Sequence, residues 1–78
     1  MTGRLLAVQA RAAIEAAEAA GTLPTDRAEW LAAAAQDVAD GRVPAAADPL
    51  SVRRAIVERA NELLCVGRPI AAAEVPEF

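Results

Sequence analysis

Apolar residues recur every three or four positions in three segments of the chain, which is the period of an amphipathic α-helix. Each segment is followed by a glycine and, two or three residues later, by a proline. This order of residues typically marks the end of a helix. The pattern therefore predicts an all-α fold, a small three-helix bundle with helices at about 3–20, 26–40 and 49–66.

The expected helix starts carry capping signals of different strength. Asp48 precedes Pro49, which places a capping side chain before a proline at the first helical position. Asp26 and Glu29 have the spacing of a capping box, and Thr2 is the expected cap of the first helix. We divide the chain into a helical domain, residues 1–67, and a partly extended C-terminal tail, residues 68–78.

The first helix carries a short seam of small apolar residues at alternating steps of four and three, a spacing typical of helix–helix contacts. Its residues are Leu6, Ala10, Ala13, Ala17 and Ala20. Twenty-two of the 78 residues are alanine, so helix propensity is high but each residue buries little area. We expect marginal stability unless a second copy or another protein adds buried surface.

The amino-acid composition argues against acid–base catalysis and against a metal site. The chain has no histidine and no tyrosine, and Ser51 has no base near it in sequence. Cys65, the single cysteine, falls at a helix C-terminus near glutamates, where a reactive thiolate is disfavoured. The glutamate pairs lie on outer helix faces without histidine, so they are read as solvated charge. The sequence thus predicts no enzyme activity, no cofactor and no metal, although an enzyme or carrier built on Cys65 stays a distant alternative.

Nucleic acid is the main competing partner. The net charge is −3, which opposes general binding to nucleic acid or to an anionic membrane. A local basic cluster could nevertheless contact DNA from the third helix, through Arg53, Arg54 and Arg59. The expected eight-residue link before that helix is longer than the turn of a helix-turn-helix motif, about 3–4 residues. A small DNA-binding regulator is therefore kept as the alternative function.

Several residues have two possible roles, and the sequence does not decide between them. Arg27 and Arg53 project into apolar helix faces, either with their heads in water or beside a partner carboxylate. Trp30 is either the largest core side chain or an interface anchor beside Arg27. The tail residues Ile70, Val75 and Phe78 either fold back onto the bundle or dock on another chain.

The function most consistent with these patterns is a non-enzymatic protein–protein interaction module: an adaptor, inhibitor, regulator or small assembly subunit. The expected partner is a protein or a second copy of the chain, with a homo-oligomer as the simplest case. One cysteine and no evident targeting or membrane segment indicate a cytoplasmic protein. The exclusive use of arginine over lysine, with abundant alanine, suggests a GC-rich bacterial or phage genome. The candidate interface residues are Leu6, Ala10, Ala13, Ala17, Arg27, Trp30, Arg53, Ile70, Val75 and Phe78.

Overall fold

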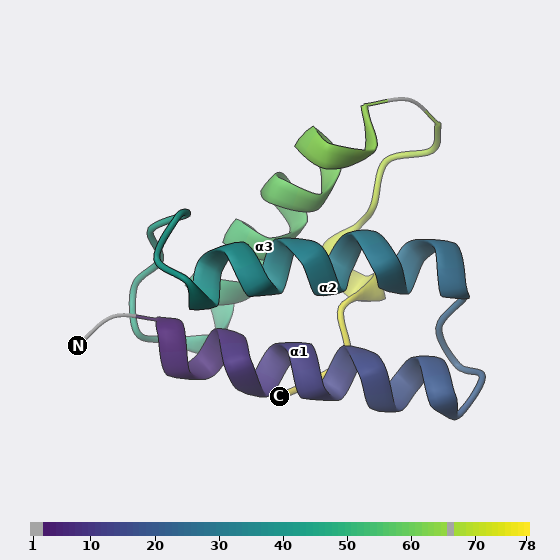
Figure 1. Ribbon diagram of the computed structural model, residues 1–78, viewed down its shortest axis with the longest axis horizontal. Coiled ribbons are helices and arrows are strands. Elements are labelled where there is room, and N and C mark those ends of the chain that lie inside the picture. Colours follow the sequence, from purple (N-terminus) through teal and green to yellow (C-terminus); the bar gives the residue numbers. More distant parts are fainter. Residues whose placement is uncertain (1–2, 66) are drawn as a thin grey trace.

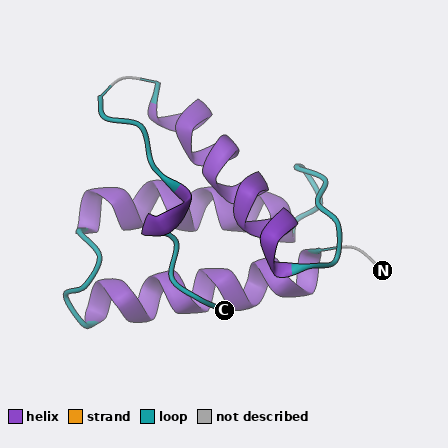
Figure 2. Ribbon diagram, turned by 180° about the vertical axis from the view of Figure 1, so that it is seen from behind, coloured by secondary structure: helices purple, strands orange, loops and turns teal. Residues whose placement is uncertain are grey.

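The computed structural model describes residues 3–65 and 67–78, and in these ranges the chain is an all-α three-helix bundle without strands. Helices α1 (Arg4–Ala19), α2 (Thr25–Ala39) and α3 (Pro49–Leu64) are followed by a short 3₁₀ helix, η1 (Ala72–Glu74). The predicted fold class is confirmed. Helices α1 and α2 form an antiparallel pair, and α3 crosses α2 obliquely (Figures 1 and 2).

Local sequence explains two of the helix starts. The Asp48 side chain accepts a hydrogen bond from the Ser51 amide at 2.9 Å, and Pro49 occupies the first turn, as predicted. The predicted capping box of α2 does not form, because the helix begins at Thr25 after Pro24 and Asp26 already lies in its first turn. A carboxylate there still interacts favourably with the helix dipole. The expected cap Thr2 lies outside the described residues.

Helices α1 and α2 end in the same way. Gly21 and Gly41 adopt φ angles of 78° and 80°, a region that favours glycine. The next amide in each case bonds back to the last turn, Thr22 N to Ala17 O at 3.0 Å and Arg42 N to Asp37 O at 2.9 Å. These are the bonds of a Schellman motif, so both glycines fix the turns as predicted.

The core lies mainly around α2, which packs on both other helices. Its largest fully buried side chains are Ile14, Leu31, Val38, Val52 and Ile56. Eight of the sixteen buried apolar residues in the described ranges are alanines, so the helices approach closely around few large groups. The core is small in volume, in accord with the composition.

The C-terminal tail completes this core. It leaves the end of α3, runs back across α2 and forms η1 (Figure 2). Ile70 and Val75 are buried, and Phe78 packs partly against the same cluster. Of the two outcomes that the sequence left open, the tail folds onto its own bundle in this structure.

Candidate interaction surface

The alanine seam predicted on α1 faces mostly inward. Ala10 is buried in the core, Leu6 and Ala17 pack partly against it, and Ala13 is half-buried. The other large group on this side is Ile14, which is fully buried. The chain's own α2, α3 and tail therefore already provide most of the neighbours of this seam.

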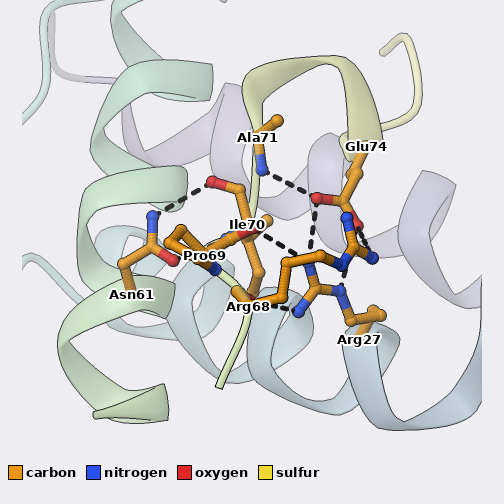
Figure 3. Close-up of polar contacts among 7 residues, drawn as sticks. All are labelled: Arg27, Asn61, Arg68, Pro69, Ile70, Ala71 and Glu74. Carbon is orange, nitrogen blue, oxygen red and sulfur yellow. Dashed lines mark hydrogen bonds and ion pairs between the residues drawn. The ribbon is translucent and has the colours of Figure 1, made fainter. Parts of the chain in front are cut away.

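Arg27 ties the tail to α2 through a partly buried ion pair (Figure 3). Its Nε and Nη2 atoms donate to the two carboxylate oxygens of Glu74, each at 3.0 Å. Its Nη atoms also donate to the backbone carbonyls of Arg68 at 2.7 Å and Pro69 at 3.0 Å. A two-pronged arginine–carboxylate pair is both strong and geometrically specific. The carboxylate partner of Arg27 is thus supplied by the same chain.

Asn61 on α3 makes the second attachment of the tail (Figure 3). Its side-chain amide donates to the carbonyl of Ile70 at 3.1 Å and accepts from the amide of Ile70 at 2.7 Å. The pair of bonds satisfies both backbone groups of a residue whose side chain is buried. Arg27, Asn61 and Glu74 are called the tail clamp below. In the sequence Asn61 is only a polar residue of the third predicted helix, and nothing local to it indicates that the tail returns to it.

The charges of the tail clamp stabilise each other. Hydrogen bonds from the Arg27 guanidinium, and then from the Ala71 amide at 2.7 Å, hold the pKa of Glu74 below its ordinary value. The same contact with Glu74 raises the pKa of Arg27. Both groups therefore stay ionised at neutral pH, and the clamp acts as a structural element without a reactive group.

Trp30 and Arg53 lie beside the core and the tail. Trp30 is partly buried against the core cluster. The Arg53 guanidinium carbon lies 5.9 Å from the centre of the Phe78 ring, within reach of a cation–π contact. Arg53 also lines a shallow hollow of about 390 Å³ together with Leu50, Arg54, Val57, Glu58 and Ala72.

The three arginines of the alternative DNA surface have different surroundings. Arg53 lies over Phe78, whereas Arg54 is exposed. Arg59 donates from Nε to Asp37 at 2.8 Å and also contacts Glu62, and the bond to Asp37 raises the pKa of Arg59. One of the three cations is therefore already held by carboxylates of its own chain.

A different strip of α1 is exposed and apolar. Leu5 and Val8 expose 61% and 55% of their surface, and Leu50 is the only other exposed large apolar side chain in the described part of the chain. Exposed alanines continue this strip along the helix. The outer face of α1 is defined here as Leu5, Val8, Ala12, Ala16 and Ala19.

The interface strip predicted from the sequence is the adjoining one, which begins at Leu6 and Ala10. Both strips follow helical spacing, since α1 is apolar around most of its circumference. One residue in the sequence could have indicated the buried side of α1. Ile14 is the only large apolar residue in the second half of the helix, and the side of α1 that carries it faces the core. The polar side, with Arg11 and Glu15 paired at 2.9 Å and Arg11 bonded to Gln36, faces α2.

The described ranges were also searched for a metal site and for a membrane span. Cys65 is exposed at the end of α3, and no three His, Cys, Asp or Glu side chains of residues 3–65 and 67–78 are grouped for a metal. None of the helices in these ranges has the length and apolar character required to span a bilayer. No protein-family model, no curated protein and no solved structure matches the chain.

Proposed function

We propose that this chain is a non-enzymatic protein-interaction module, an adaptor, inhibitor, regulator or small assembly subunit, that binds protein through the outer face of α1. The observation that carries this proposal is the exposure of Leu5 and Val8 on one helix side, continued by exposed alanines. Single apolar residues on a surface need no explanation, but a contiguous apolar strip marks a contact site.

The packing of α1 supports the same choice of surface. The buried side of α1 contributes Ala7, Ala10 and Ile14 to the core, and Arg4 and Arg11 bond to residues of α2. The outer face makes no comparable contribution to the bundle. A helix with small side chains also lets a partner helix approach to the short end of the usual range, about 8 Å between axes. The face is therefore suited to a helical partner.

The tail and Arg27 have a different role in this proposal. Ile70 and Val75 are buried, and Arg27 is occupied by Glu74, so these groups hold the bundle in shape. In the proposal they set the position of α1 and do not themselves meet the partner. The single cysteine, which leaves no internal disulfide, suits the reducing cytoplasm of a bacterial or phage-infected cell.

Photo-crosslinking at single alanines tests this function. A photoreactive residue is placed at Ala12, on the outer face, or at Ala33, an exposed alanine of α2 that serves as the matched control. In cells of the native host, irradiation should link the Ala12 variant to protein, which is either the chain itself or a distinct species, and should leave the Ala33 variant unlinked. Equal linking at both positions, or none at Ala12, would refute the proposed surface.

A further inference from the structure

We infer that the protein bound by the outer face of α1 is a second copy of this chain, paired with α1 antiparallel about a two-fold axis at Ala12. This inference rests on the proposed function and assigns its partner. It is carried by two independent patterns on α1, the order of large and small side chains and the order of charges.

The first pattern is that large side chains before Ala12 are matched by small side chains at the same distances after it. Leu5 and Ala19 lie equally far from Ala12 along the helix, and so do Val8 and Ala16. An antiparallel pair centred on Ala12 therefore places Leu5 against the partner's Ala19 and Val8 against the partner's Ala16. Each large side chain meets a small one, and Ala12 meets the partner's Ala12 at the axis.

A parallel pair lacks this fit. It would place Leu5 against the partner's Leu5 and Val8 against the partner's Val8 at one end of the helix. Only alanines would then meet at the other end, so one helix spacing could not satisfy both ends. Close packing of uniform density favours the antiparallel arrangement.

The second pattern is the order of charges along the flank of the outer face. Arg4 and Arg11 lie in the first half of α1, and Glu15 and Glu18 lie in the second half. A two-fold axis perpendicular to both helices brings the same flank of the two copies together in reverse order. Along this flank each Arg11 then lies between the partner's Glu15 and the partner's Arg11, at equal distances along the helix, and Arg4 lies near the partner's Glu18.

Arg4 and Arg11 each also donate a hydrogen bond to α2, so these charged groups lie at the border between the α2 contact and the outer face. The side chains of Arg11 and Glu15 are 46% and 56% exposed, although they also pair within the helix. An antiparallel pair additionally sets the two helix dipoles in their favourable orientation. In a parallel two-fold pair the two charged flanks would lie on opposite sides of the contact, so these charges would not meet. The face is thus electrostatically complementary to itself in one orientation.

The size of the outer face of α1 determines the affinity expected for the dimer. A helix of 16 residues is about 24 Å long. One helix face of that length buries area near the lower end of specific interfaces, about 1,200 Å² in total. We therefore expect a reversible dimer with a dissociation constant on the order of 10 µM.

Sedimentation equilibrium and engineered cysteines test the dimer and its register on the full chain. All cysteine variants carry Cys65→Ser, which removes the exposed native thiol. Ala12→Cys should form a disulfide-linked dimer by itself. Val8→Cys and Ala16→Cys should link efficiently only when the two variants are mixed, and Ala33→Cys is the matched control that should stay unlinked.

Charge variants give an independent readout. Arg11→Glu and Glu15→Arg should each lower self-association at least about tenfold, and an equimolar mixture of the two should restore a heterodimer. A monomer at concentrations up to about ten times the expected dissociation constant would overturn the inference. So would efficient linking of Val8→Cys to itself, which indicates a parallel pair. A purified monomer that still crosslinks at Ala12 to another protein in cells would overturn the dimer and leave the proposed function standing, whereas no crosslink anywhere on this face would overturn both.

Discussion

Replacement of Glu74 by glutamine probes how the tail is held. Glu74→Gln keeps the shape of the side chain but removes its charge and turns one acceptor oxygen into a donor. In the structure one carboxylate oxygen accepts from Arg27 Nε, and the other accepts from Arg27 Nη2 and from the Ala71 amide. Whichever way the new amide is oriented, its NH₂ group faces at least one N–H donor, so a bond is lost and a buried repulsion appears.

The size of the effect follows from these contacts. A hydrogen bond to a charged group contributes about 1.5–3 kcal/mol, so the loss of one such bond at Glu74 should lower the unfolding free energy by about 2 kcal/mol. For a domain of this size each kcal/mol corresponds to about 4–8 °C in melting temperature, which gives a decrease of about 8–16 °C. This is a large share of the total stability expected of a small domain, about 5–10 kcal/mol.

Thermal unfolding followed by circular dichroism measures this decrease, with Glu77→Gln as the control. Glu77 lies in the same tail, is exposed and loses the same charge, but it forms no ion pair with the other described residues. Its variant should stay within about 0.5 kcal/mol of the native chain. Hydrogen exchange at the Ile70 and Ala71 amides should accelerate in Glu74→Gln only. Equal melting temperatures for the two variants would refute the role given to the tail clamp.

Four further outcomes are expected. Because Arg27 lowers the folded pKa of Glu74, the stabilisation from this carboxylate is complete above its unfolded pKa of about 4.3 and is lost as the pH falls through the lower folded value. Urea titrations of the native chain and of Glu74→Gln should therefore differ by a constant amount from about pH 7 to pH 5 and converge in more acidic solution. Asp48→Ala should lower the melting temperature by removing the bond to the Ser51 amide, whereas Asp48→Ser should recover most of the loss, and an unchanged melting temperature in Asp48→Ala would contradict the cap. Cys65→Gly should raise the unfolding free energy by up to about 1 kcal/mol, because Cys65 adopts φ 61°, and Cys65→Ser should not; a lower value for the glycine variant would contradict the strain. Leu31→Ala should cost about 3 kcal/mol in a denaturant titration, since Leu31 is fully buried, and a cost below about 1 kcal/mol would show a loosely packed core.

The course of the helices could be predicted from the sequence because the signals are local. Gly21 and Gly41 end helices through their own backbone conformations, and Asp48 with Pro49 begins one through adjacent residues. Such features act over a few positions and need no knowledge of the fold. The boundary of α3 was less accurate: the helix ends at Leu64, before the predicted 66, because Cys65 already leaves the helical conformation.

The arrangement of the tail and the choice of surface could not be predicted because they depend on distant residues. Arg27 was expected either beside water or beside a partner's carboxylate, and the group it meets is Glu74, which lies 47 positions further along the chain. On α1 two apolar strips had helical spacing, and only the positions of α2, α3 and the tail decide which of them is covered. Periodicity reveals that a helix is amphipathic, but an alanine-rich helix has too little variation in side-chain size to reveal its inward side.

In the dimer that we propose, the outer face of α1 contacts a second copy of the chain. Amide chemical shifts recorded by NMR from about 10 µM, the expected dissociation constant, up to about 1 mM are the decisive measurement. We expect concentration-dependent shifts concentrated at Leu5, Val8, Ala12 and Ala16, with the tail amides of Ile70 and Val75 unchanged. Shifts that stay constant over this range, or that concentrate on the tail, would contradict it.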